Sequence, residues 1–122
     1  MNLPKGVYID NLIADLKKFS WEASEILLYY SKKLKDSDFK SEIINKTDLN
    51  QPVTVADLKV NELIKKRIKE FYPKVCWDFL SEEDSKLEGK LFNPKYNWLW
   101  VLDPLDGTKD FIQGTGNYAM HL

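Results

Sequence analysis

The chain is organised around residues 98–112, which read Trp98-Leu99-Trp100-Val101-Leu102-Asp103-Pro104-Leu105-Asp106-Gly107-Thr108-Lys109-Asp110-Phe111-Ile112. The apolar residues 98–102 predict a buried strand. Two carboxylates follow it three residues apart, and then come Gly107, Thr108 and a segment that can begin a helix. A strand that delivers acidic side chains beside backbone N–H groups can hold a hard cation against a phosphate.

Length and composition limit the class of protein. The 122 residues, of which 43% are hydrophobic and 13% aromatic, predict one folded domain with a core of its own. A net charge of −1 gives no general attraction to nucleic acid or to an anionic membrane, so neither is expected as a partner. The single cysteine, Cys76, excludes an internal disulfide and a zinc site built from cysteines. Because no apolar run reaches the ~20 residues of a spanning helix and residues 1–10 lack a signal segment, we expect a cytoplasmic protein.

Two amphipathic helices are predicted before residue 98. Residues 9–34 carry apolar side chains at helical spacing over about seven turns, and the opposite face is charged. A second helix opens with the capping-box pattern of residues 54–57 and ends before Pro73. Its apolar face comprises Val60, Leu63, Ile64, Ile68 and Phe71, and its solvated face comprises Lys65, Lys66, Arg67 and Lys69.

The remaining segments predict short strands. Residues 42–55 contain two extended pieces around a turn at residues 47–52, which predicts a hairpin with an exposed tip. Residues 75–80 predict a strand in which Cys76 is a small buried side chain and not a nucleophile. Residues 117–122 begin another extended piece, with His121 as a packed or surface side chain. Because that strand has no later partner, we expect a sequence that is cut in the middle of a fold.

Acidic side chains recur where strands end. Asp57 lies where a strand gives way to a helix, Glu82 follows residues 75–80, and Asp103 and Asp106 follow residues 98–102. Each has an ordinary alternative role, as a helix cap, a solvated turn or an Asp-Gly turn. Together, Glu82, Asp103 and Asp106 supply the carboxylates that Mg²⁺ prefers, without sulfur or imidazole.

The turn after Asp103 offers further polar groups. Pro104 donates no hydrogen bond, which leaves the Leu105 carbonyl free to point inward as a ligand. Gly107 lets the backbone approach a phosphate, and Thr108 offers a hydroxyl that orients a water. A cation held here would acidify a water and neutralise charge on phosphoryl oxygens. The expected reaction is therefore hydrolysis of a phosphate monoester by in-line attack of water.

The motif Asp103-Pro104-Leu105-Asp106-Gly107-Thr108 resembles the signature of the inositol monophosphatase superfamily of Mg²⁺-dependent, lithium-sensitive phosphatases. Residues 52–57 and 80–84 resemble its two upstream motifs, in the right order. The resemblance implies an α+β fold in which long amino-terminal helices pack on a mainly antiparallel sheet, the first half of the layered αβαβα sugar-phosphatase fold. Residues 1–122 would be the amino-terminal metal-binding domain of a longer protein, whose second α/β domain adds a metal-binding aspartate and most of the substrate-selecting surface.

The resemblance also implies roles for individual residues. The implied metal ligands are Asp57, Glu82, Asp103, the Leu105 carbonyl and Asp106. The implied catalytic residues are Asp57, Glu82 and Thr108, with Thr108 and Glu82 orienting the attacking water. The implied phosphate-binding residues are Leu105, Asp106, Gly107 and Thr108. Lys46 matches a lysine that the family places beside the metal cluster, and an exposed hairpin lysine explains it equally well.

The sequence around Leu105 and residues 109–112 is most similar to the 3′(2′),5′-bisphosphate nucleotidase branch of this family. That branch implies conversion of 3′-phosphoadenosine 5′-phosphate to AMP and phosphate, a step in sulfur metabolism. Two alternatives stay open: an inositol monophosphatase, and a catalytically incomplete fragment that binds metal or phosphate. The expected partner is a small-molecule phosphate ester, and the oligomeric state is left open.

Overall fold

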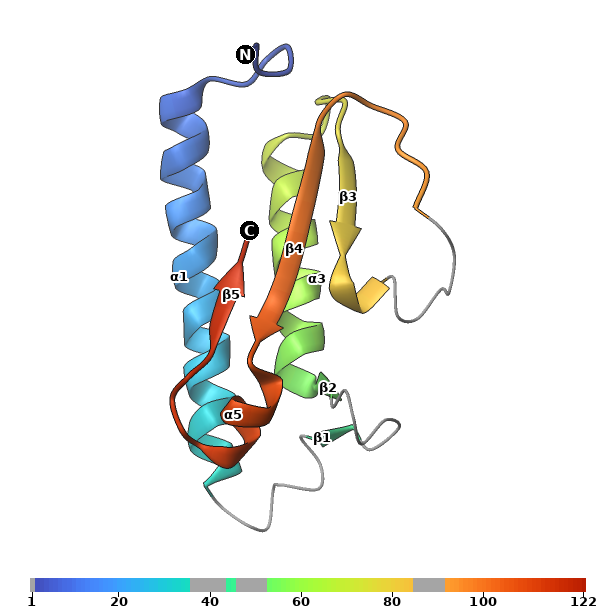
Figure 1. Ribbon diagram of the computed structural model, residues 1–122. Coiled ribbons are helices and arrows are strands. Elements are labelled where there is room, and N and C mark those ends of the chain that lie inside the picture. The colour runs from blue at the N-terminus through green and yellow to red at the C-terminus, as the bar shows by residue number, and fades with distance from the viewer. Residues whose placement is uncertain (1, 36–43, 46–52, 85–91) are drawn as a thin grey trace.

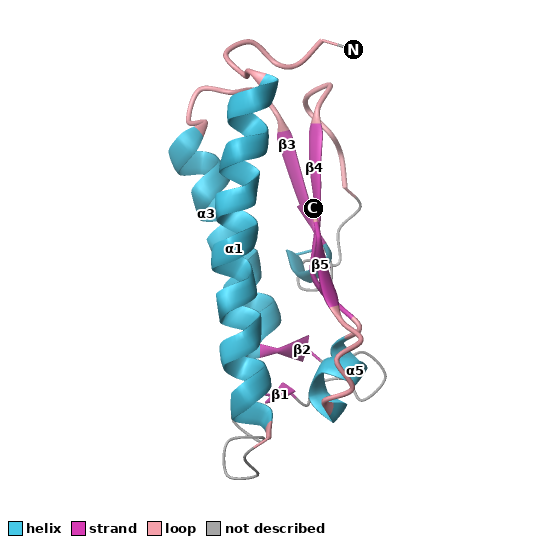
Figure 2. Ribbon diagram, turned by 90° about the vertical axis from the view of Figure 1, so that its left-hand side faces the viewer, coloured by secondary structure: helices cyan, strands magenta, loops and turns pink. Residues whose placement is uncertain are grey.

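Two long helices lie side by side against one face of a small sheet (Figures 1 and 2). The computed structural model describes residues 2–35, 44–45, 53–84 and 92–122. In chain order the elements are α1 (Ile9–Leu34), β1 (Ile44–Asn45), β2 (Val53–Thr54), α3 (Val55–Phe71), β3 (Asp78–Ser81), β4 (Leu99–Asp106), α5 (Thr108–Gln113) and β5 (Ala119–His121). No helix within the described ranges combines the length and the apolar composition that a bilayer crossing requires.

Helix α1 has the bounds that the apolar spacing predicts, and it packs along α3. The ring of Phe19 meets that of Phe71 edge to face, with 5.0 Å between their centroids. At the border of this contact, the Arg67 Nε donates to a Glu22 carboxylate oxygen at 2.8 Å. The buried residues that α1 contributes to the core are Leu12, Phe19, Ala23, Leu27 and Leu34.

Helix α3 begins with the predicted capping box. The Thr54 hydroxyl accepts a hydrogen bond from the Asp57 N–H, and the Asp57 side chain accepts one from the Thr54 N–H. The apolar face is confirmed at Val60, Ile64 and Ile68, which are buried. Phe71, expected on the same face, is 46% exposed, because it is the last residue of the helix.

The expected solvated face of α3 is wrong in part. Lys65 is partly buried, because its ammonium forms an ion pair with Asp84 at 2.6 Å. Arg67 is held by Glu22 in the same way. Lys66 and Lys69 are exposed, as predicted.

The predicted hairpin is confirmed as a pairing of strands. Strands β1 and β2 are antiparallel, with Ile44 opposite Thr54. The second strand ends one residue earlier than expected, because Val55 is already the first residue of α3. The predicted turn at residues 47–52, and Lys46 with it, lie outside the described residues.

The main sheet has the strand order β3-β4-β5. Strands β3 and β4 are parallel, and β4 and β5 are antiparallel. The main sheet is therefore mixed, with one parallel and one antiparallel pairing, and the separate pair of β1 and β2 is antiparallel. Helices packed on a small mixed sheet confirm the predicted α+β class.

Strand β4 differs from the expected buried strand in length and in burial. It continues to Asp106, because Asp103 pairs with His121 and Asp106 with Ala119 of β5, with an irregularity between these two pairs. Asp103 and Asp106 thus lie within the strand and not after it. Val101 is 57% exposed, whereas Leu102 is buried, because alternate side chains of a strand face opposite sides of the sheet.

The strand predicted at residues 75–80 begins three residues too early and ends one residue too early. The parallel ladder starts at Asp78, whose N–H donates to the Trp98 carbonyl at 2.8 Å. Cys76 lies before that ladder and is exposed, so its expected burial is wrong. His121, in contrast, is a surface side chain of β5, as expected.

Candidate metal centre

The sheet topology brings the predicted site residues to one edge. Because β3 and β4 are parallel, their carboxyl ends lie together, with Glu82 directly after β3 and Asp103 in the last half of β4. The start of α3, which carries Asp57, and the start of α5, which carries Thr108, reach the same region (Figure 1). Residues separated by up to 51 positions are in hydrogen-bond contact there.

Glu82 and Asp103 form the central pair. Their carboxyl groups are hydrogen-bonded, and the charge of Asp106 also acts on Asp103. Burial, and then the hydrogen bond and charge of Glu82, raise the pKa of Asp103 to about 6, while the Leu105 N–H at 3.2 Å from Oδ1 opposes this shift. Two carboxyl groups in such contact require a shared proton or a nearby cation.

The third predicted carboxylate, that of Asp106, is not part of the contact between Glu82 and Asp103. Asp106 is exposed, and among the described residues no three Asp, Glu, Cys or His side chains are grouped closely enough to hold one metal ion. The structure therefore places Glu82 and Asp103 in direct contact and leaves Asp106 at the rim of the pair. The role of these residues as metal ligands stays a prediction.

Asp57 is almost fully buried, at 1% exposure. Its Oδ2 accepts the N–H and the hydroxyl of Thr54, at 2.9 and 2.5 Å. Its Oδ1 accepts the Thr108 hydroxyl at 3.3 Å. Burial raises the pKa of Asp57, and the hydrogen bonds from Thr54 and Thr108 oppose that rise. One carboxylate oxygen of Asp57 thus belongs to the cap of α3, while the other accepts the Thr108 hydroxyl.

Thr108 connects Asp57 to the Asp103–Thr108 motif. Its Oγ1 lies 3.1 Å from the Leu105 carbonyl oxygen and 3.3 Å from Asp57 Oδ1, so one proton serves two acceptors. The Leu105 carbonyl was expected to point inward, and this contact turns it toward the same hydroxyl. Asp57, Leu105 and Thr108 are therefore one connected unit.

The backbone conformation and close packing at residue 107 explain why it is a glycine. Its φ is +81°, and a Cβ built on it would lie 2.5 Å from the Asn117 carbonyl oxygen. The return of the chain toward β5 passes so close that no side chain fits at this position. The predicted approach of a phosphate to Gly107 is an additional role and not the sole explanation for the glycine.

The donor set fits a hard cation such as Mg²⁺. All candidate ligands are oxygen atoms, and Glu82 and Asp103 are hydrogen-bonded carboxyls whose contact raises the pKa of Asp103. Within the described part of the chain, no lysine or arginine forms an ion pair with Asp57, Asp103 or Asp106. A divalent cation would supply positive charge to these three carboxylates.

Sequence reasoning missed the hydrogen bond from the Thr54 hydroxyl to Asp57. It also missed the difference in burial between Glu82 and Glu83. Thr54 was identified as a helix cap, yet its hydroxyl also donates to Asp57. Glu83 is buried at 2% exposure and Glu82 is exposed, although the sequence predicted one acidic turn. The capping-box pattern at residues 54–57 could have indicated the contact of Thr54, because the Asp57 carboxylate belongs both to the helix cap and to the candidate site.

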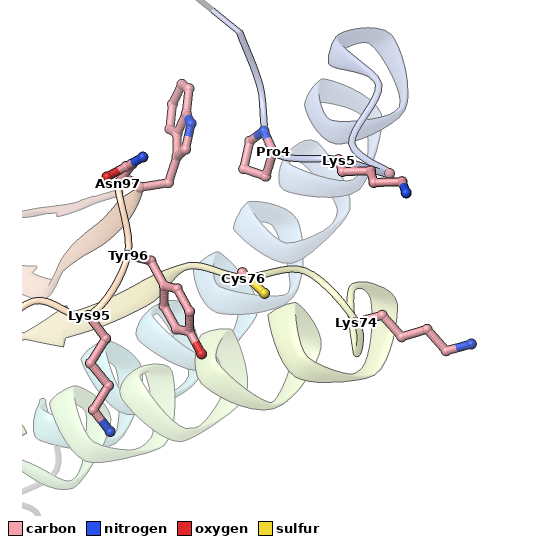
Figure 3. A pocket seen from close by; sticks show the side chains of 9 residues that line it. Pro4, Lys5, Lys74, Cys76, Lys95, Tyr96 and Asn97 are labelled. Carbon is pink, nitrogen blue, oxygen red and sulfur yellow. The ribbon is translucent and has the colours of Figure 1, made fainter.

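A large surface cavity lies away from these acids. It measures about 700 Å³ and lies at the amino ends of β3 and β4, whereas Glu82 and Asp103 lie toward their carboxyl ends. Figure 3 shows Lys5 and Lys74 extending to one side of it and Lys95 pointing away from them. The lining residues are Pro4, Lys5, Gly6, Lys74, Cys76, Lys95, Tyr96, Asn97 and Trp98. The candidate centre and this cavity are separate features.

Comparison with known proteins identifies a family. A family model described as the inositol monophosphatase family matches residues 9–122. The 3′(2′),5′-bisphosphate nucleotidase CysQ of Haemophilus influenzae is 37% identical over 73 residues, which cover 58% of this chain and 25% of that protein. Nus factor SuhB of Vibrio cholerae is 34% identical over 73 residues, covering 60% and 25%.

A solved structure supports the same fold. The extragenic suppressor protein SuhB from Bartonella henselae aligns with a TM-score of 0.67 at 20% identity, over 90% of this chain and 38% of that one. At this identity the likeness is one of fold alone. The chain spans between a quarter and about two fifths of the length of these relatives.

Proposed function

Because this chain belongs to the inositol monophosphatase family, we propose that it forms part of a Mg²⁺-dependent phosphate monoester hydrolase. The observation that carries the proposal is the hydrogen-bonded pair of Glu82 and Asp103 at the strand ends, beside the unit of Asp57 and Thr108. The chain spans only part of its relatives' length, so the proposal concerns what these residues contribute to the reaction.

The proposed metal ligands are those of the motif. Glu82, Asp103, the Leu105 carbonyl and Asp106 would hold Mg²⁺, and Asp57 would hold a further ion or help to activate water. When bound, Mg²⁺ supplies positive charge that lowers the pKa of a water and stabilises charge developing on the phosphoryl oxygens. Burial, and then the hydrogen bond and charge of Glu82, raise the pKa of Asp103, and a cation would offset these effects by favouring its charged form.

Thr108 is the proposed orienting group for the attacking water. Its hydroxyl proton is directed to Asp57 Oδ1 or to the Leu105 carbonyl, so the lone pairs of Oγ1 can accept a hydrogen bond from water. The Glu82 carboxylate is the second acceptor and can receive the proton that the water loses. Together the two acceptors would align the water oxygen with the phosphorus atom.

The start of α5 is the proposed phosphate contact. The first N–H groups of a helix have no acceptor within the helix, and here they follow Gly107 at the site. The backbone at Gly107 and Thr108 would donate to phosphate oxygens, with Asp106 and Leu105 on the metal side of the same group. These backbone donors and a bound cation would both stabilise negative charge on the phosphoryl oxygens.

The proposed substrate is 3′-phosphoadenosine 5′-phosphate, cleaved to AMP and phosphate. The similarity to bisphosphate nucleotidases at 37% identity supports this choice. Inositol monophosphate is the second candidate, supported by the family match. The third possibility is a chain that binds metal or phosphate without turnover.

Phosphate release separates these candidates. We expect Mg²⁺-dependent release from the nucleotide with a kcat/KM about tenfold or more above that for inositol 1-phosphate. The assay should use both this chain and the full product of its gene. A preference for inositol 1-phosphate would overturn the nucleotide assignment, and Mg²⁺ binding without release from either substrate would favour the non-catalytic chain.

A paired substitution tests the site. Asp106→Asn removes a ligand charge with little change of shape, and we expect release to fall at least about a hundredfold. Asp10→Asn is the matched control, because Asp10 is an exposed aspartate in the first turn of α1. Near-normal release by the Asp106 variant would contradict the proposed ligand set.

A further inference from the structure

The acidic turn that carries Glu82 is attached to α3 by polar contacts of Asp84. The Asp84 Oδ1 accepts a hydrogen bond from Asn61 Nδ2 at 3.1 Å. Its Oδ2 accepts one from the Lys65 ammonium at 2.6 Å. Both carboxylate oxygens are thus engaged by side chains of one helix, 19 and 23 residues away in the sequence.

Asn61 and Lys65 reach the turn from the same face of α3. Residues four apart on a helix lie one above the other, so the two side chains can hold one carboxylate between them. Asn61 is only 6% exposed, and the side chains of Lys65 and Asp84 are 32% and 29% exposed. A partly buried, charge-assisted contact of this kind is stronger and more directional than a surface ion pair.

The backbone alone does not fix this turn. Ser81 is the last residue of the ladder between β3 and β4, where it pairs with Leu102. Residues 82–84 form a helical turn beyond that ladder, with the Glu83 N–H donating to Ser81 Oγ at 3.3 Å. The contacts of Asp84 join the far end of this turn to α3.

Lys65 also contacts the strand that leads into the turn. Its ammonium lies 5.8 Å from the centroid of the Phe79 ring on β3. It therefore touches residues on both sides of Glu82, in addition to sitting on the helix whose first turn carries Asp57. Lys65 and Asn61 thus link the segment around Glu82 to the helix that carries Asp57.

We propose that Asn61 and Lys65 are positioning residues, which hold the Glu82 carboxylate against Asp103 by anchoring Asp84 to α3. This inference rests on the proposed function for its consequence, since a correctly placed Glu82 is what the metal site requires. Outer contacts of this kind change metal affinity by about 10- to 100-fold when they are removed. Asn61 and Lys65 would act on the site through Asp84.

Amide hydrogen exchange of the metal-free chain tests the anchoring itself. Lys65→Met and Asn61→Ala should each speed exchange at residues 82–84 by about tenfold or more, with exchange in the middle of α3 unchanged. Lys65→Arg keeps the charge and the donor, and should restore most of the protection. Lys66→Met is the control, because the Lys66 side chain is 66% exposed and pairs with Glu70 of its own helix, at 3.8 Å.

Magnesium titration by calorimetry tests the consequence. We expect the dissociation constant for Mg²⁺ to rise about tenfold in Lys65→Met, to return toward the original value in Lys65→Arg, and to stay unchanged in Lys66→Met. Unchanged exchange at residues 82–84 in Lys65→Met would overturn the inference, even if Asn61→Ala failed to fold. If the unaltered chain binds no Mg²⁺, the proposed function fails, and the anchoring is judged by exchange alone.

Discussion

At the scale of one residue, Asp103 shows the effect of placing two carboxyl groups in contact. Its carboxyl is partly buried and hydrogen-bonded to that of Glu82, and both effects raise its pKa, to about 6. Asp57 is raised in the same direction by burial. The folded chain therefore holds acidic side chains in positions that disfavour their charged forms unless a cation is present.

This arrangement predicts a pH dependence of stability. Because the folded pKa of Asp103 is about 6 and its ordinary value is 3.8, the folded chain binds this proton more tightly than the unfolded chain does. The stabilisation is complete below about pH 4 and is lost as the pH rises through about 6; Asp57 contributes with the same sign.

Denaturant unfolding in the presence of a chelator measures this effect between pH 4 and 7. Asp103→Asn keeps the shape and cannot ionise, so the difference in unfolding free energy between the variant and the unaltered chain should grow in favour of the variant as the pH rises. A difference that is constant across this range would contradict the assignment of the raised pKa to Asp103.

Gly107 allows a second prediction at this scale. Gly107→Ala should lower the unfolding free energy by about 2–4 kcal/mol, because its positive φ and the clash with Asn117 add together. Gly114→Ala is a matched control, since Gly114 also has a positive φ, +75°, with nothing within 4 Å of its Cβ position. We expect only about 1 kcal/mol there. Thermal or urea unfolding of both variants compares them, and equal losses would show that the clash is relieved.

At the scale of the elements, α3 contributes both to the candidate site and to the core. Its first turn places Asp57, its second and third turns place Asn61 and Lys65 against Asp84, and its apolar face is part of the core. The capping box that starts the helix uses the carboxylate that Thr108 also contacts. Stability of the helix start and geometry of the site are therefore linked through one side chain.

Thr54→Val tests that link. The substitution keeps the shape of the side chain and removes the hydroxyl that accepts from the Asp57 N–H and donates to its carboxylate. We expect a loss of about 1–2 kcal/mol in unfolding free energy, the usual value of a helix cap. Thr54→Ser should recover most of this loss in the same urea titration. Full stability of the valine variant would mean that the cap contributes nothing here.

On the scale of the whole molecule, the site depends on how the layers are assembled. The two helices cover one face of the sheet, and the start of α3, the end of β3, the end of β4 and the start of α5 reach one edge (Figure 1). The buried residues that hold these layers together include Phe19 of α1, Ile64 of α3, Leu102 of β4 and Phe111 of α5. Loss of the layer packing would separate all the candidate ligands at once.

Magnesium should therefore stabilise the whole fold. A ligand that binds only the folded chain adds about 2.7 kcal/mol at a concentration of 100 times its dissociation constant. We expect the thermal midpoint to rise with MgCl₂ and not with KCl at equal ionic strength. Glu82→Gln should abolish the rise by removing half of the central pair. A rise that persists in this variant would place the bound ion elsewhere.

Much of the fold could be predicted because local rules specify it. The spacing of apolar residues gave both bounds of α1, and the capping-box pattern gave the start of α3. The bounds of β3 and β4 were wrong, because they depend on partners: β3 begins where Trp98 accepts its first hydrogen bond, and β4 continues to Asp106 because β5 returns beside it. No local pattern contains that information.

The candidate site divides in the same way. Sequence motifs identified Asp57, Glu82, Asp103 and Thr108, and the structure brings Glu82 to Asp103 and Thr108 to Asp57. They did not show that Asp106 stays exposed, nor that Asp84 is held by α3. Both follow from which elements pack beside the motif.

The sequence by itself determined the two helices, the polar chemistry of the motif and the resemblance to a phosphatase family, because these depend on residue type and on short spacing along the chain. Only the tertiary structure decided which carboxyls touch, how far each pKa moves and which side chains hold Glu82 in place. The physical reason is that burial, hydrogen bonding and charge repulsion depend on distances between residues that the chain brings together only when its layers pack.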